Sequence, residues 1–79
     1  MSIVTCRILM EDTISKEQYF INGFFESSKV QSAYTWVDDN GNIRKELTSI
    51  FFDGGNSHVV EMPLNQVIDY CQSIPFSVN

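Results

Sequence analysis

The clearest structural signal in the chain lies in residues 30–52, which read VQSAYTWVDDNGNIRKELTSIFF. Two segments rich in β-branched and aromatic residues, 30–37 and 43–52, flank the polar segment 38–42. Asn and Gly tolerate the positive φ angles that a tight hairpin turn requires. The pattern therefore predicts two antiparallel strands joined by a turn at 38–42. Simple alternation along the second strand places the odd-numbered residues from Ile43 to Phe51 on one face.

The residues that follow this hairpin predict a third strand and then a helix. Asp53-Gly54-Gly55-Asn56 is a second turn signal, and residues 57–62 form a short strand that completes a three-stranded meander. From Pro63 the period changes. Four apolar side chains recur at helical spacing in residues 63–73, namely Leu64, Val67, Ile68 and Cys71. Pro suits the first helical position, and Pro75 is expected to end the helix.

The residues before the hairpin contain one clear strand and one ambiguous segment. Residues 2–10 alternate and are rich in β-branched side chains, which predicts a strand. Residues 15–29 allow two interpretations. Ser15 and Gln18 fit a helical capping box, whereas Asn22-Gly23 between aromatic residues fits the turn of a β-hairpin. We prefer the strand interpretation because Gly23 would weaken a short helix.

These elements predict an α+β fold. We expect an antiparallel sheet of four to five strands in a meander, with one C-terminal helix packed on a face, because a sheet needs a second layer to bury its apolar side. The 79 residues are expected to form a single domain, 1–79. The helix is expected to be essential, so Ile68→Asp should unfold the protein.

Composition excludes several classes of partner. Ten acidic residues against five basic ones give a formal net charge of −5, so nucleic acid is an unlikely partner. No apolar run is long enough to span a membrane. The N-terminal segment lacks a basic region and Arg7 interrupts its apolar stretch, which is unlike a signal peptide. We therefore expect a cytoplasmic protein in which Cys6 and Cys71 are reduced thiols.

No candidate chemistry survives inspection of its motif. Asp38, Asn40 and Asn42 fit the first ligands of a calcium loop, but the Gly and Glu that such a loop needs later are missing. His58 lacks a nucleophile on its own strand face. Gly54-Gly55 leads into a strand rather than a helix, unlike a phosphate loop. We predict no catalytic, cofactor-binding or metal-binding residues, and the protein is not expected to be an enzyme.

The sequence instead favours binding to a macromolecule. Trp and Tyr dominate interface hot spots, and acidic residues beside them steer a basic partner. The predicted partner-binding residues are Tyr34, Trp36, Asp38 and Asp39, with Phe24 and Phe25 as a second choice. Trp36 could equally be a core residue.

In size, acidity and sheet-plus-helix plan the chain resembles small accessory proteins of bacteriophages, anti-CRISPR proteins included. That resemblance implies an inhibitor that occupies a surface on a host protein complex or defence system. The alternative is a self-associating domain, a homodimer or larger homo-oligomer, that binds a small ligand or regulates a partner. Free sheet edges favour it, because little Lys or Pro blocks them.

Overall fold

The computed structural model describes residues 3–72 of the chain. These residues form one five-stranded antiparallel sheet and one α-helix packed against it, which confirms the α+β prediction. The elements are β1 (Ile3–Glu11), β2 (Gln18–Glu26), the 3-10 turn η1 (Ser27–Lys29), β3 (Val30–Val37), β4 (Ile43–Phe52), β5 (Ser57–Val60) and α1 (Leu64–Cys71). The strand order is β2-β1-β5-β4-β3, so β2 and β3 form the edges. The predicted meander is β3-β4-β5, and Pro75 lies outside the described residues.

The connection between β1 and β2 corrects the prediction for residues 15–29. Strand is the right interpretation, but Asn22 and Gly23 lie inside β2 rather than in a hairpin turn. The turn occupies residues 12–17. The Asp12 carboxylate accepts hydrogen bonds there from two backbone N–H groups, and Lys16 adopts a φ of 64°. Ser15 caps no helix, because it lies in this turn and its hydroxyl accepts from the N–H of Glu17 at 3.2 Å.

Gly23 serves packing rather than a turn. It lies directly opposite Cys6 in a β1–β2 register that pairs every position from Ile3 to Glu11 without interruption. A Cβ atom at Gly23 would lie 2.6 Å from Cδ1 of Ile8. The missing side chain therefore makes room for a core residue of the neighbouring strand.

A register shift in the β3–β4 hairpin breaks the predicted alternation of β4. Thr35 pairs with Thr48, but the next residue of β3, Trp36, pairs with Arg44. Residues 45–47 of β4 therefore have no partner at this point. As a result two consecutive residues, Leu47 and Thr48, are both buried, although simple alternation would put them on opposite faces.

The sheet curls around its core. In a flat sheet, β2 and β4 would lie about 14 Å apart, at three strand spacings, yet the rings of Phe25 and Phe52 approach to 6.0 Å between centroids. The short turn η1 joins the two edge strands, so the edges meet at that end. The buried apolar core consists of Val4, Ile8, Phe25, Ile50, Val60, Met62 and Val67.

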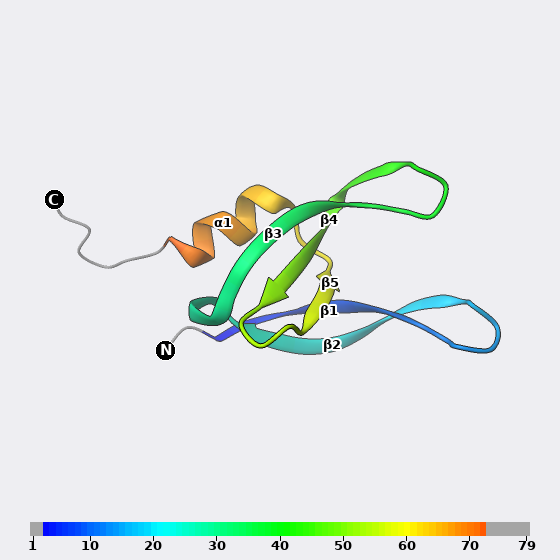
Figure 1. The fold of residues 1–79 in the computed structure, drawn as a ribbon, viewed down its shortest axis with the longest axis horizontal. Helices are drawn as coiled ribbons and strands as arrows, with labels where there is room; N and C mark the ends of the chain where they lie inside the picture. The colour runs from blue at the N-terminus through cyan, green and yellow to red at the C-terminus, as the bar shows by residue number, and fades with distance from the viewer. Residues whose placement is uncertain (1–2, 73–79) are drawn as a thin grey trace, which may run out of the picture.

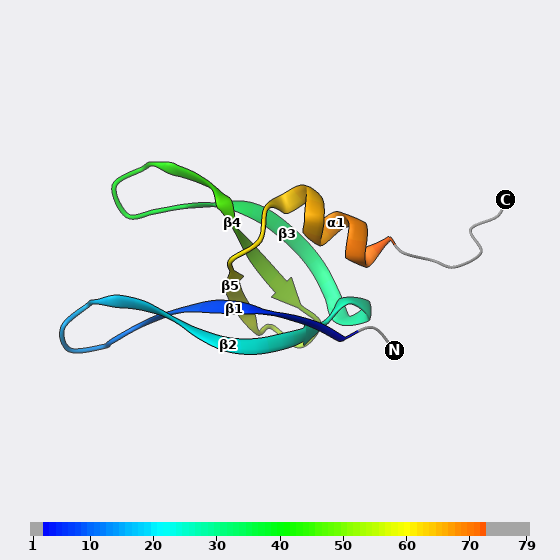
Figure 2. The same cartoon turned by 180° about the vertical axis from the view of Figure 1, so that it is seen from behind.

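At the other end the edges separate. The β1–β2 and β3–β4 hairpins project side by side, and their tips lie at the same end of the molecule in both views (Figures 1 and 2). The fold is thus closed at η1 and open between the two tips.

The helix packs on β3, β4 and η1 through a narrower stripe than the sequence predicted. Val67 is 1% exposed and belongs to the core, whereas Ile68 is 41% exposed and Cys71 is also exposed. Pro63 is the N-cap rather than the first helical residue. Ile68→Asp is therefore no longer expected to unfold the protein, because its carboxylate can reach water; Val67 takes that role.

Candidate functional site

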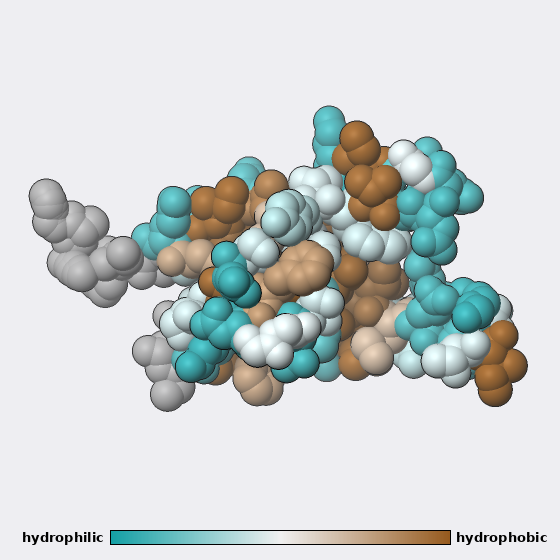
Figure 3. Space-filling model, in the orientation of Figure 1, coloured by the Kyte–Doolittle hydropathy of each residue, from teal (hydrophilic) through white to brown (hydrophobic). Residues whose placement is uncertain are grey.

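A hollow with a volume of about 670 Å³ lies between the two hairpin tips. The β1–β2 hairpin contributes one wall and the β3–β4 hairpin the other. Its lining residues are Glu11, Lys16 and Gln18 on the first wall, and Asp38, Asp39, Asn40 and Arg44 on the second. We call this site the inter-hairpin cleft. Figure 3 shows it as an indentation between two groups of hydrophilic atoms.

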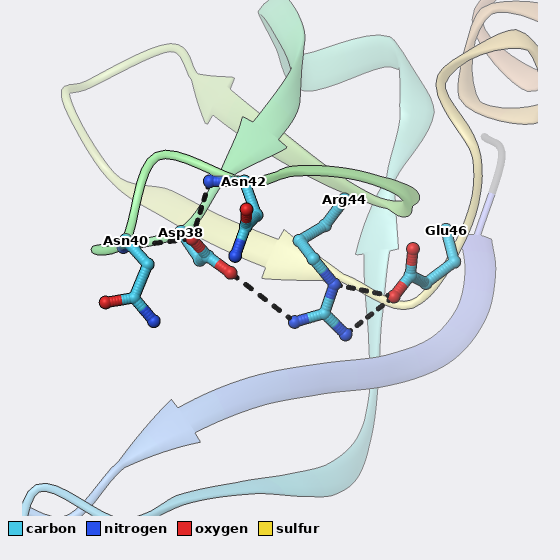
Figure 4. Close-up of polar contacts among 5 residues, drawn as sticks. All are labelled: Asp38, Asn40, Asn42, Arg44 and Glu46. Atoms are coloured by element: carbon cyan, nitrogen blue, oxygen red, sulfur yellow. Dashed lines mark hydrogen bonds and ion pairs between the residues drawn. The ribbon is translucent and has the colours of Figure 1, made fainter.

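The wall formed by the β3–β4 hairpin is held by a polar network that centres on Asp38 (Figure 4). Asp38 Oδ1 accepts hydrogen bonds from the backbone N–H groups of Asn40 and Asn42, at 3.0 and 2.9 Å. Its other oxygen lies 3.9 Å from the guanidinium of Arg44. Arg44 also donates from Nε and Nη2 to one carboxylate oxygen of Glu46, at 2.9 and 2.6 Å. Asp38 and Arg44 are therefore already engaged within the hairpin.

The other wall contains a second ordered turn. The Asp12 carboxylate accepts from the N–H groups of Ile14 and Ser15, at 2.8 and 3.1 Å. These hydrogen bonds favour the ionised form and lower the pKa of Asp12 below its usual value. In the second hairpin, the backbone N–H of Glu46 and then the Arg44 side chain lower the pKa of Glu46. Both carboxylates are consequently charged at neutral pH.

Three charged groups of the cleft remain available to a partner. Within residues 3–72, the side chains of Glu11, Asp39 and Lys16 make no hydrogen bond or ion pair. Residues 11–18 and 37–46 together carry six acidic and three basic residues. The open end of the sheet therefore accounts for three of the five net negative charges.

Apolar side chains accompany these charges at the tips. Ile14 is 91% exposed in the β1–β2 turn, and Ile43 and Val37 form an exposed pair at the end of the β3–β4 hairpin. Sequence patterns did not indicate these residues, nor Glu11 and Lys16, as part of a contact surface. Ile14 carried a usable signal, because an isolated apolar residue in a polar turn has no core to enter.

Two of the predicted aromatic residues lie on β3, outside the lining of the cleft. Ala33 packs toward the core, so alternation directs Tyr34 and Trp36 to the opposite face of the sheet from α1. Tyr34 is exposed and its ring makes an edge contact with Phe51, with centroids 5.8 Å apart. Trp36 is half-buried and lies opposite Arg44. The structure thus brings together Tyr34, Trp36, Asp38 and Asp39 along one hairpin.

The second-choice aromatic residues do not join this surface. Phe24 is 61% exposed, but it lies on β2, separated from β3 by the three inner strands of the sheet. Phe25 is buried against Phe52 in the core, so its assignment to a contact surface is wrong. Adjacent strand residues point to opposite faces, and only one face of β2 meets the core.

The histidine and the two cysteine thiols lie away from the cleft. Within residues 3–72 there is no cluster of three or more His, Cys, Asp or Glu side chains that could hold a metal ion. His58 is exposed, and its ring lies 5.8 Å from that of Phe52. Burial raises the pKa of the Cys6 thiol and that of Cys71, which lowers the fraction of reactive thiolate at neutral pH.

In the described residues no helix has the length and apolar character needed to cross a membrane. Comparison of the whole chain with models of protein families, with curated proteins and with solved structures finds no match.

Proposed function

We propose that the chain is a non-enzymatic binding protein that docks a basic surface of a partner protein at the open end of its sheet. The observation that supports this proposal is the inter-hairpin cleft, where unengaged carboxylates lie beside exposed apolar side chains. A macromolecule of opposite charge fits this combination better than a small molecule, because the cleft opens between two projecting turns.

The charge of the cleft argues for a basic partner. Glu11 and Asp39 are free to form ion pairs, whereas Arg44 is already bound by Glu46 and Asp38. Lys16 adds a positive charge, but the tips together remain net negative. Such a field accelerates encounter with a basic surface and repels phosphate backbones. Nucleic acid accordingly stays an unlikely partner.

The exposed apolar residues near the tips would supply the binding energy that exposed charges alone do not provide. Ile14, Ile43 and Tyr34 are among the most exposed large apolar side chains of the described residues. Binding energy concentrates in such residues when they become buried at the centre of an interface, and surrounding charges exclude wrong partners. We expect Ile14 and Ile43, at the hairpin tips, to make apolar contacts beside the carboxylates of the cleft, and Tyr34 to add a contact on the outer face of β3.

The biological role that we propose is inhibition. The resemblance in size, acidity and plan to phage accessory proteins supports an inhibitor that occupies a surface on a bacterial enzyme or defence complex. A protein of 79 residues can block a larger complex by covering one surface, and this mode needs no catalytic residue.

The test is affinity capture from a bacterial lysate, followed by binding kinetics with the captured partner once it is purified. The charge variant is Glu11→Gln with Asp39→Asn, which removes two carboxylates and keeps side-chain shape. Its matched control is Asp53→Asn with Asp69→Asn, which removes two exposed charges away from the tips. The apolar variant is Ile14→Ser with Ile43→Ser.

We expect the charge variant to lower the association rate about tenfold at low salt, and the control to change it less than about twofold. The difference should shrink as salt rises, because exposed charges are screened. The apolar variant should mainly raise the dissociation rate. A partner that binds all variants equally, or that is lost only with the control, would refute the proposed site.

A further inference from the structure

The edge strand β2 presents a long row of unpaired backbone groups. It has nine residues and pairs with β1 at every position, and no described strand pairs with its other side. Its last residues, Phe24 to Glu26, border a hollow of about 320 Å³ beside Phe52 and the β4–β5 turn, so the open part of the edge lies before them. In Figures 1 and 2 it forms the border of the sheet. An exposed edge of this length is a template for another strand, and β2 contains no Lys or Pro that would block pairing.

The turn at residues 12–17 shows which backbone groups of β2 point outward. The N–H of Asp12 donates to the carbonyl of Glu17 at 2.9 Å, so this pair is a hydrogen-bonded pair of the ladder. Hydrogen-bonded pairs alternate along an antiparallel ladder. The odd-numbered residues of β2 therefore bond to β1, and the five even-numbered residues from Gln18 to Glu26 direct N–H and C=O outward. The bond from the N–H of Glu61 to the carbonyl of Arg7 agrees, because it places Arg7 toward β5.

The other edge, β3, is less suitable for pairing. An extra residue, Gln31, lies between the paired positions Val30 and Ser32, so the spacing of its backbone groups is interrupted. These residues also border the groove against α1. Bulges and covering elements are the usual protection of sheet edges. In the described residues, β2 thus has no bulge, and only its end at Phe24 to Glu26 lies close to another part of the sheet.

We propose that β2 pairs antiparallel with β2 of a second copy of this chain, with Asn22 opposite Asn22 of the partner subunit. The two sheets would become one continuous ten-stranded sheet around a two-fold axis. This inference does not depend on the proposed function, because it rests on the unpaired backbone of β2 and not on the charges of the cleft, with Gln18 as the one residue of β2 that borders both surfaces.

The sequence of β2 is complementary to itself in this register. With a two-fold axis perpendicular to the sheet, the core-side face of one copy continues into the core-side face of the other. The residues of β2 whose N–H and C=O groups point away from β1 then pair with the same set of residues in the partner subunit. Phe20 then lies opposite Phe24 of the partner subunit, twice, and such aromatic pairs stabilise sheets. Ile21 lies opposite Gly23 of the partner subunit, on the face where Ile8 already approaches that glycine. The proposed contact covers Phe24 and Ile21, which are 61% and 42% exposed.

The charges agree with the same register. Glu26 is the only charged residue of β2, and it lies opposite Gln18 of the partner subunit, whose amide can donate to it. The acidic turn of one copy also points toward η1 of the other, which carries Lys29. A shift by two residues in either direction breaks the Phe20–Phe24 pairs. One such shift also places Glu26 against Phe20, which costs desolvation.

The first experiment measures molar mass by light scattering after size exclusion, from about 1 to about 200 µM, the range of a modest interface. The wild type should approach the mass of a dimer at high concentration. Phe24→Lys should shift it to the monomer, whereas Tyr34→Lys, the same change at an exposed aromatic of the other edge, should not. A wild type that stays monomeric over this range overturns the proposal. So does loss of the dimer with Tyr34→Lys but not with Phe24→Lys.

The second experiment tests the register by disulfide formation and does not need a destabilising change in the edge. The native cysteines are first removed by Cys6→Ala and Cys71→Ser. In the proposed register, the Cα atoms of residue 22 in the two copies lie about 5.5 Å apart, so two Asn22→Cys side chains are within range of a disulfide. Two Gln18→Cys thiols would be about 27 Å apart. Asn22→Cys should therefore cross-link about tenfold faster or more, through its high effective concentration. Equal rates for the two variants would overturn the register and the pairing, with circular dichroism confirming that both are folded.

Discussion

Replacing Gly23 with alanine tests how β1 packs on β2, and the structure defines both the cost and its remedy. The new Cβ would lie 2.6 Å from Cδ1 of Ile8, but 3.4 Å from its Cγ1. Only the terminal methyl of Ile8 therefore collides. Ile8 is 8% exposed and belongs to the core, so this methyl has little room to move. Ile8→Val removes that methyl and leaves the rest of the contact.

The expected free energies follow from two opposing effects. Alanine stabilises a strand interior by about 0.5–1 kcal/mol relative to glycine, whereas overpacking a core costs about 1–3 kcal/mol. Gly23→Ala should thus destabilise the wild type by about 1 kcal/mol. Ile8→Val alone should cost about 0.5–1.5 kcal/mol. In the Ile8→Val background, Gly23→Ala should become neutral or stabilising.

The assay is a double-mutant cycle by urea denaturation at one fixed protein concentration. The expected coupling between the two substitutions is about 1–3 kcal/mol, a shift of roughly 1 M or more in urea midpoint. A hairpin turn at Asn22-Gly23 would give a different result, because a positive φ at Gly23 would penalise alanine whatever stands at position 8. Additive effects, within about 0.5 kcal/mol, would refute the packing argument.

Three further outcomes are expected. Val67→Asp should abolish the cooperative thermal transition seen by circular dichroism, because the site is 1% exposed, while Ile68→Asp, 41% exposed, should keep it. A normal transition for Val67→Asp would mean that the helix is not docked. Thr48→Val should lower the free energy of unfolding in urea by about 1–3 kcal/mol, since its buried hydroxyl donates to the Met62 carbonyl at 2.6 Å; an unchanged urea midpoint would contradict this. Backbone hydrogen bonds lower the pKa of Asp12. The stabilisation from these hydrogen bonds is therefore present above the usual Asp pKa and is lost as the pH falls through the lowered pKa of Asp12. Asp12→Ala removes this pH dependence, so it should flatten the acid limb of a curve of unfolding free energy against pH. An acid limb as steep as that of the wild type would exclude this role.

Local patterns in the sequence were sufficient for most secondary structure. The strand at 30–37, the turn at 38–42, the strand at 43–52 and the helix all lie close to their predicted positions. Turn residues, period-two alternation and a helical stripe each depend on short-range backbone preferences. The acidic hairpin of the candidate site was predictable for the same reason, since Asp38 and Asp39 accompany an Asn-Gly turn.

Local sequence patterns did not predict the features that depend on pairing with a distant strand. The Asn22-Gly23 pair has the local signature of a turn, yet a continuous register with β1 keeps it extended, and the glycine serves Ile8 across the strand pair. The burial of Leu47 depends on a register shift against β3 that alternation cannot anticipate.

The site was also completed only by the tertiary structure. Glu11 and Lys16 are more than twenty residues from Asp38 in the chain, and they reach the same cleft because η1 joins the two sheet edges and the curled sheet opens at the opposite end. Phe24 and Phe25 are neighbours of the same chemical type, and which of them is buried depends on which face of β2 meets the core. For residues 30–72 the sequence by itself determined which segments become strands, turns and helix, whereas between 12 and 26 it left the position of the turn open. The partners of these segments were decided in three dimensions, because burial of apolar surface is shared among elements far apart in the chain and no single segment specifies it.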